Sequence, residues 1–297
     1  MGGVLAFEVA RPVVLGIVQG AGVGLMAIGL VLIYKSSRIF NFAAGEFATV
    51  GAFGAYLTKS HVPFAFAALL GVVAALATGL LTERFVVRPL ANRPRVTLLV
   101  ATAAVAIFLI AFQFLAGAQG KLFGAKALVS GNAFRLFGVF VSWQEVVIVV
   151  VLAGAGAALA WFFGGTDLGL ATLATSQEPT AARLMGIRLN RVAMLSWGMA
   201  GAMGGVAGVL LPPLTQNFTP AFGTTDLLIP AFTAAVLGGM TSVPGAFVGG
   251  LVLGLVQNLA QFNVSSNSLP GAPAVAVLAV LVLVLVVRPT GILGREA

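Results

Sequence analysis

The sequence predicts an all-α polytopic membrane protein, and two observations support that fold class. The chain of 297 residues is 60% hydrophobic and only 8% charged, with a mean hydropathy of +1.09. Because a soluble domain carries roughly 25% charged residues, this composition cannot cover a water-exposed surface. In addition, apolar runs of about 20 residues, the length of a membrane-spanning helix, recur along the whole chain. We therefore expect a single transmembrane domain over residues 1–297.

Apolar segments give the expected number of spans. They are 12–34, 40–58, 62–82, 96–118, 143–163, 192–211, 226–239, 243–262 and 273–288. As a helix, 96–118 would reach about 35 Å, enough for a hydrocarbon core of roughly 30 Å. Since two of the segments are short and 40–58 is interrupted by glycines, we expect eight to nine spans, one or more broken or re-entrant. No basic region precedes the first apolar run, so no cleavable signal peptide is expected.

The basic residues between these segments predict the orientation in the membrane. The net charge of +8 is interpreted as a topology signal beside anionic lipid, and no nucleic-acid partner is expected. If the loop 83–95 is cytoplasmic, the inside set comprises Lys35, Arg38, Arg84, Arg88, Arg93, Arg95, Arg183, Arg188, Arg191, Arg288 and Arg295. The outside set is then Arg11, Lys59, Lys121, Lys126 and Arg135. This asymmetry predicts an outside N-terminus and an inside C-terminus in a cytoplasmic membrane.

Several kinds of chemistry are missing from the sequence. It has no cysteine, and its single His61 falls at an expected helix end. There is no nucleotide-binding P-loop, no zinc-type cluster and no G-x-S-x-G nucleophile motif, so we expect no catalytic residue, no metal and no cofactor bound by this chain. The few acids near the spans, Glu46, Glu145 and Asp226, make a charge-coupled carrier less favoured. A passive or externally powered pathway for a small solute remains.

The stretch "SSRIFNFAAGEFATVGAFGAYL" (36–57) contains the main pathway candidates, which are Asn41, Glu46 and Thr49. A carboxylate at the centre of a membrane costs about 2.5–3.5 kcal/mol even on the insertion scale for charged groups. Glu46 therefore needs compensation. It either bonds to the freed amides of its own broken helix, which is a structural role, or lines the pathway or meets a partner permease.

Glycines spaced four residues apart indicate close helix packing. The pairs include Gly201 with Gly205 and Gly245 with Gly249; whether they pack within one subunit or between subunits stays open. A second glycine pattern, "TVGAFGAYL" (49–57) against "SVPGAFVGGLVL" (242–253), relates the two halves of the chain. Paired broken segments can flank a transport path, but chance similarity explains this resemblance equally well.

The loop 164–191 is expected to be a cytoplasmic coupling loop. Within it, Ser176 as N-cap, Glu178 and Pro179 in the first turn, and Gly186 as terminator predict a short helix over 176–185. This helix either rests on the membrane surface or docks in a groove of a cytoplasmic partner. The residues assigned to coupling are Glu178, Thr180, Ala181, Ala182, Leu184, Met185 and Gly186.

Five motifs in order along the chain resemble the permeases of branched-chain amino acid ABC importers, LivH type. They are "NFAAGE", "VVRPLANRPRVTLLVATAAV", "AARLMGIRLNRV", "FTAAVLGGMTSVPGAFVGGLVLGLVQ" and "RPTGILG". The resemblance implies a second, LivM-like permease, two cytoplasmic ATPases that use ATP and Mg²⁺, and an extracytoplasmic solute-binding protein. ABC permeases in general carry an EAA-x-x-x-G loop; here Thr180 replaces its Glu, while Ala181, Ala182 and Gly186 keep the spacing.

The expected function is therefore an ABC-importer permease for branched-chain or related small amino acids or amides, in which the partner ATPases, and not this chain, hydrolyse ATP. The alternative is a self-sufficient channel or carrier for a small neutral solute such as urea, since the absence of a P-loop fits both. A third hypothesis is a structural membrane scaffold. Because the resembling permeases serve amino acids, amides and urea, the sequence does not fix the solute.

Overall fold

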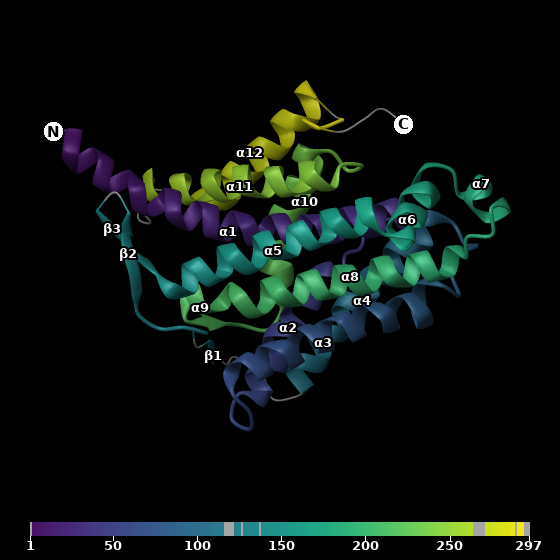
Figure 1. Ribbon diagram of the computed structural model, residues 1–297, viewed down its shortest axis with the longest axis horizontal. Coiled ribbons are helices and arrows are strands. Elements are labelled where there is room, and N and C mark those ends of the chain that lie inside the picture. The colour runs from purple at the N-terminus through teal and green to yellow at the C-terminus, as the bar shows by residue number, and fades with distance from the viewer. Residues whose placement is uncertain are drawn as a thin grey trace.

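Long helices lie side by side along one axis of the molecule (Figure 1). The computed structural model describes residues 2–115, 122–125, 127–136, 138–263, 271–288 and 290–293, with only the backbone of residues 2–9 and 263. Lys121, Lys126 and Arg295, three of the basic residues used to predict orientation, lie outside the described residues. The predicted all-α membrane fold is confirmed.

The elements follow one another with short connections. The helices are α1 (Gly2–Ser37), α2 (Ala44–Thr58), α3 (Phe64–Thr82), α4 (Arg95–Gln113), α5 (Trp143–Gly165), α6 (Asp167–Gln177), α7 (Pro179–Leu184), α8 (Leu189–Leu210), α9 (Pro212–Thr215), α10 (Ile229–Gly238), α11 (Val243–Asn263) and α12 (Ala272–Val287). The π-helical stretch η1 (Glu83–Val87) extends α3, and the π-helical stretch η3 (Gly223–Leu228) precedes α10. The strands are β1 (Phe123–Gly124), β2 (Asn132–Leu136), β3 (Val139–Ser142) and β4 (Asn217–Phe218).

Each predicted apolar segment contains a helix. Among the described residues, six helical stretches are long and apolar enough to cross a membrane, and η3–α10 and α12 are shorter apolar helices. Helix α2 has 15 residues, about 22 Å, and falls short of a bilayer core of roughly 30 Å. The segment 40–58 is thus incomplete as a span, but its glycines do not break it: the helix starts late, at Ala44, and runs through Gly45, Gly51 and Gly54.

The membrane helices form two sets, α1 to α4 and α8 to α12. The first helix of each set packs against a helix of the other set. Helix α1 runs antiparallel to α11, because Gly16 lies against Leu255 and Gly24 against Phe247. In the same way α8 runs antiparallel to α3, with Gly201 against Ala75 and Gly205 against Val72. Each set also contains a short membrane helix after its first long one. This short helix is α2 in the first set and η3–α10 in the second set. The sequence similarity between 49–57 and 242–253 pairs α2 with α11 instead, so this arrangement does not match it.

Glycine makes these close contacts possible. A Cβ at Gly20 would lie 2.8 Å from the carbonyl oxygen of Gly250, and one at Gly51 would lie 2.7 Å from the Cα of Gly205. Such distances leave no room for a side chain, so the helix backbones meet directly. The predicted packing glycines all lie at contacts within the chain: Gly201 and Gly205 meet α3, whereas Gly245 and Gly249 meet α10.

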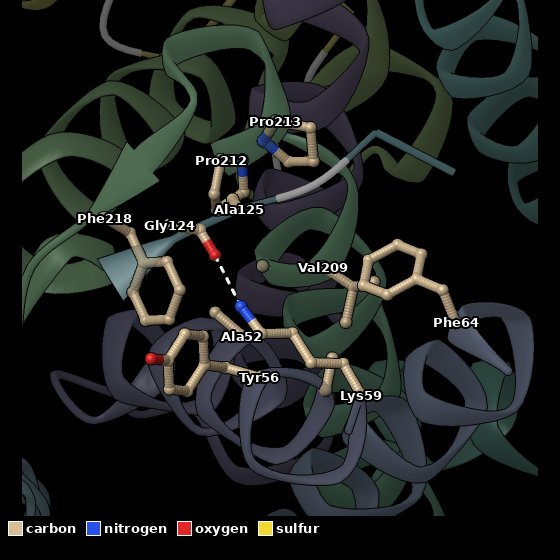
Figure 2. A pocket seen from close by; sticks show the side chains of 12 residues that line it. Ala52, Tyr56, Lys59, Phe64, Gly124, Ala125, Val209, Pro212, Pro213 and Phe218 are labelled. Carbon is tan, nitrogen blue, oxygen red and sulfur yellow. Dashed lines mark hydrogen bonds between the residues drawn. The ribbon is translucent and has the colours of Figure 1, made fainter. Parts of the chain in front are cut away.

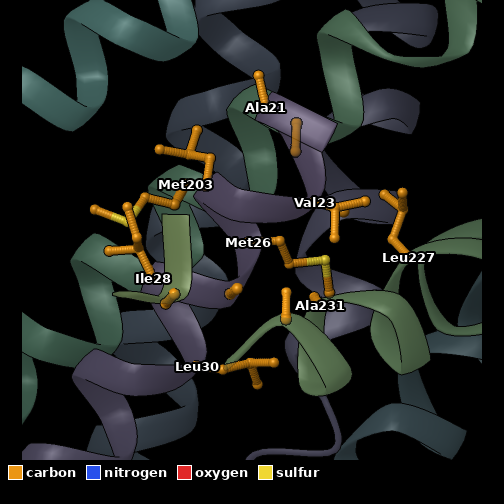
Figure 3. Packing of buried hydrophobic residues seen from close by; sticks show 14 of the residues in the cluster. Ala21, Val23, Met26, Ile28, Leu30, Met203, Leu227 and Ala231 are labelled. Atoms are coloured by element: carbon orange, nitrogen blue, oxygen red, sulfur yellow. The ribbon is translucent and has the colours of Figure 1, made fainter. Parts of the chain in front are cut away.

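Helix α1 forms the centre of the fold, and most of its spanning part is buried. Figure 3 shows Met26 and Val23 of α1 beside Leu227 and Ala231, and Ile28 beside Met203 of α8. The outer helices are the reverse, since they expose apolar side chains as lipid-facing helices do. Examples on α3, α4, α5 and α12 are Leu69, Val73, Ile107, Phe108, Val150, Trp161, Leu278 and Val286.

The two ends of the molecule differ in character. One end, here called the basic end, carries the C-terminus of α1, α6, α7, and the start of α8 (Figure 1). Arg88 lies there, since its guanidinium donates to the Asn190 carbonyl at 3.4 Å, and so does Arg38. The opposite end carries the antiparallel hairpin β2–β3, in which Phe134 pairs with Val141, and the short pair β1–β4. Hydropathy did not indicate the hairpin, which lies in the connection between α4 and α5.

Candidate functional site

Glu46 lies in the first turn of α2 and is completely buried. Both of its carboxylate oxygens accept hydrogen bonds from distant segments. The Gln113 Nε2 at the end of α4 donates to Oε2 at 2.6 Å, and the Thr224 hydroxyl of η3 donates to Oε1 at 2.6 Å. Since a helix N-terminus favours negative charge, α2 itself adds to this compensation.

Further hydrogen bonds extend these contacts into what we call the polar cluster: Glu46, Thr49, Gln113 and Thr224. The Gln113 Oε1 accepts from the Ala221 N–H at 3.0 Å, and the Thr49 hydroxyl oxygen accepts from the Gly223 N–H at 3.0 Å. The cluster therefore ties α2, α4 and the start of η3 together. It also satisfies N–H groups around the start of η3, which would otherwise be unpaired inside the membrane.

The backbones of α2 and η3 meet at this point. A Cβ at Gly45 would lie 2.7 Å from the carbonyl oxygen of Gly223, so each position requires glycine for the close approach. Two incomplete helices thus start beside one another, and the side chain of Glu46 joins them. These contacts cross-link distant segments of the chain and differ from the bonds to its own helix amides that the sequence suggested for a structural Glu46.

Asn41 contributes differently from the other two pathway candidates. Its Oδ1 accepts from the Ala43 N–H at 3.0 Å, just before α2 begins, and its Nδ2 is buried without a hydrogen-bond partner among the described residues. The structure therefore joins Glu46 and Thr49 in one cluster and leaves Asn41 outside it. Sequence reasoning did not identify Gln113 or Thr224, because they lie 67 and 178 residues from Glu46.

A small pocket lies at the opposite end, between α2, β1 and α8 (Figure 2). The Lys59 ammonium donates to the Gly124 carbonyl at 2.9 Å and lies 3.8 Å from the centre of the Tyr56 ring. The pocket has a volume of about 20 Å³, room for little more than a single water and too small for an amino acid. Lys59 here fastens the strand β1 to α2.

The loop 164–191 holds two helices, α6 and α7, instead of the one predicted over 176–185. Ser176 is not an N-cap: it is buried in the last turn of α6. Helix α7 begins at Pro179, and its N-cap is Glu178, two residues after Ser176. The reason is that Pro179 lacks the N–H that would continue α6, yet its fixed φ suits a new helix start. The Glu178 Oε1 accepts from the Thr180 N–H at 3.4 Å.

Helix α7 ends where the sequence predicted, at Gly186. This residue has φ +83°, and its N–H donates to the Arg183 carbonyl at 3.0 Å. The Ile187 N–H donates to the Ala182 carbonyl at 3.1 Å, which completes a Schellman motif. The predicted terminator is confirmed.

The apolar residues of α7 point in two directions. Ala182 is buried, with 4% of its surface exposed, whereas Leu184 and Met185 are each 84% exposed. Thr180 and Ala181 are also exposed. Only part of the predicted coupling set therefore faces outward, and Ala182 packs inward against the chain itself.

Arg38 connects this loop to the centre of the fold. Its guanidinium donates to the Ser176 carbonyl at 2.6 Å, at the C-terminus of α6, where a cation is favoured by the helix dipole. Arg38 itself has φ +53° and lies between α1 and α2. This hydrogen bond ties the end of α6 to the segment that leads to Glu46.

Comparisons with known proteins agree with this architecture. The family described as branched-chain amino acid transport system / permease component matches residues 13–287. The chain is 32% identical to the high-affinity branched-chain amino acid transport system permease protein LivH of Salmonella typhimurium, over 94% of each chain. It is also 32% identical to the permease protein BraD of Pseudomonas aeruginosa, over 97% of each chain.

A solved structure shares the fold. It is that of PsaBC from Streptococcus pneumoniae in complex with Fab, of which one chain aligns with a TM-score of 0.51 at 14% identity, over 93% of this chain and 91% of that chain. The family match and the relatives agree with the helices that are long and apolar enough to span a membrane. The chain thus belongs to the permease components of branched-chain amino acid transport systems.

Proposed function

We propose that this chain is the membrane-spanning permease subunit of an ABC importer that moves branched-chain or related small amino acids or amides inward. Family membership supports the class of solute. Because the sequence has no P-loop, ATP and Mg²⁺ bind to the partner ATPases, which hydrolyse the ATP. The remaining partners are a second, LivM-like permease and an extracytoplasmic solute-binding protein.

One observation carries the proposal: α7 presents Leu184 and Met185 to the surroundings at the basic end. A capped helix with an exposed apolar pair is suited to seat in a groove of another protein. The neighbouring Arg183, Arg188 and Arg191 make a position within the lipid core unfavourable. In the proposed orientation the basic end faces the cytoplasm, where the ATPases are, the N-terminus lies outside and the C-terminus inside.

Isolation of the tagged chain from its native membranes tests the proposal. We expect a second permease and two ATPase chains to co-isolate, and ATP hydrolysis by the reconstituted complex to rise when the loaded solute-binding protein is added. A homo-oligomer that passes urea without ATP would instead establish a self-sufficient channel or carrier. A complex that moves no solute would establish a scaffold.

A further inference from the structure

A second, larger cleft lies toward the end opposite α7. It has a volume of about 330 Å³ and lies between α1, the end of α8, β4, η3 and α11. This volume is at the small end of the range of roughly 300–1,000 Å³ that small-molecule sites have. The polar cluster contributes no residue to its lining, so the cleft is a separate feature.

Asp226 of η3 lines this cleft and differs from the other acids of the membrane region. Glu83 pairs with Arg88 at 2.8 Å and Glu145 pairs with Arg11 at 2.8 Å, while Glu46 accepts two hydrogen bonds within the polar cluster. Asp226 is exposed and makes no ion pair with any described residue. A carboxylate that lines a cleft without a counter-ion is suited to bind a cationic group, and π-helical stretches such as η3 are frequent at functional sites.

Two amide side chains lie in the same lining, Gln19 of α1 and Gln257 of α11. The Gln19 Oε1 accepts from the Asn258 Nδ2 at 2.9 Å, which fixes the orientation of the Gln19 amide. The Gln19 Nε2 donates to none of the described residues, so its N–H groups are available to an acceptor in the cleft. The cleft thus offers an anionic acceptor on η3 and an amide donor on α1.

The rest of the lining combines the polar residues Thr215, Asn217 and Thr219 with apolar side chains. Val23, Leu211 and Leu227 are almost completely buried, and Phe222 lies beside them on the turn before η3. A ligand that matches the carboxylate of Asp226, the amide of Gln19 and the apolar side chains needs a cationic group, a hydrogen-bond acceptor and a small apolar part. An aliphatic α-amino acid has these groups, as an ammonium, a carboxylate and a hydrocarbon side chain.

We infer that this cleft is a binding site for an aliphatic amino acid within the permease, with Asp226 as the counter-ion of the α-ammonium group. Gln19 donates to the carboxylate, and Val23, Leu211 and Leu227 contact the side chain. The inference rests on the proposed function, since it names where the permease itself holds the solute after the solute-binding protein has released it.

The test measures binding of radiolabelled L-leucine to the isolated membrane complex without the solute-binding protein. Leucinol, which keeps the ammonium group, is expected to displace leucine, whereas 4-methylpentanoate, which lacks it, is not. Asp226→Asn should weaken leucine binding by about tenfold or more, because a charge-assisted hydrogen bond is lost. Gln257→Ala should weaken it less, and Gln261→Ala, one turn further along α11 and outside the lining, should leave it unchanged.

Two results would overturn the inference: leucine binding to Asp226→Asn equal to that of the native complex, or equal displacement by both competitors. Because Asp226 is exposed and Asn has nearly the same shape, the Asp226→Asn variant should assemble. If it does not assemble, Asp226→Glu replaces it in the test: this variant keeps the charge and should retain the preference for leucinol. If the native complex with its solute-binding protein imports no branched-chain or related small amino acid or amide, the proposed function fails. If it imports leucine but binds none by itself, only this inference fails.

Discussion

Two glutamates, Glu46 and Glu178, stand at the start of helices and have opposite surroundings. Glu46 lies in the first turn of α2, is completely buried, and accepts from Gln113 and Thr224 at 2.6 Å each. Glu178 caps α7 in the open and accepts only the Thr180 N–H, at 3.4 Å. Both side chains complement a helix N-terminus, which is a local effect. What separates them is the surroundings: distant segments of the same chain around Glu46, and exposed surface around Glu178.

Because the two carboxylates have different surroundings, mutations can separate the roles of the two regions. A change in the polar cluster should alter the folded state, because its partners are in the chain. A change on the outer face of α7 should leave the folded state unaltered and affect assembly.

The largest effect is expected from Glu46→Leu. It leaves the Gln113 amide and the Thr224 hydroxyl unpaired in the membrane interior, and each such buried group costs about 1–3 kcal/mol. We expect a large loss of folded protein, measured as the monodisperse fraction in detergent and as the melting temperature. Glu46→Gln retains an acceptor for Thr224 and should fold and transport.

Glu178→Ala is the matched control for Glu46, because it removes a helix-start carboxylate that is exposed. Loss of an N-cap costs about 0.5–2 kcal/mol, here confined to α7. The melting temperature should stay at the native value. Normal folding of both Glu46→Leu and Glu46→Gln with lost transport would contradict the structural role and assign Glu46 to the pathway.

A smaller effect is expected from Gly186→Ala. No atom lies within 4 Å of the added methyl group, so the cost comes from the backbone at φ +83°, about 1–2 kcal/mol for a residue other than glycine. The end of α7 should fray, and ATPase association should weaken while the melting temperature of the chain is unchanged. Binding of the ATPases at native strength would show that the Schellman motif is dispensable for coupling.

The mildest change is Asn92→Cys, which adds a thiol to a chain without cysteine. Asn92 is exposed in the loop between η1 and α4. If the basic end faces the cytoplasm, an impermeant maleimide should label the thiol in inverted vesicles and not in intact cells. Labelling from outside intact cells would reverse the proposed orientation.

Sequence reasoning identified both regions but not the contacts within them. Hydropathy located every apolar segment, and Pro179 and Gly186 located α7, because these signals are local. Sequence reasoning could not identify the partners of Glu46, since Gln113 and Thr224 become its neighbours only through tertiary packing. Ser176 was a wrong choice of N-cap: it has the preferred residue type, but α6 continues through it until Pro179 stops the helix.

The outward and inward faces of α7 show the same limit. The sequence grouped Ala182 with Leu184 and Met185 as one apolar face, whereas the structure buries the first and exposes the other two. Ala182→Asp would place a charge inside the loop and disturb its fold, so loss of transport in that variant would not identify a docking surface. The exposed pair provides the cleaner test.

The most direct test of the account is the double variant Leu184→Asp with Met185→Asp, reconstituted with the ATPases. Since both side chains are 84% exposed, the melting temperature should equal that of the native chain, while ATPase binding and solute uptake should be lost. Leu136→Asp, the same kind of change on the hairpin at the opposite end, should retain both. If the double variant binds the ATPases and imports solute at the native rate, α7 is only a surface helix and the proposed coupling is wrong.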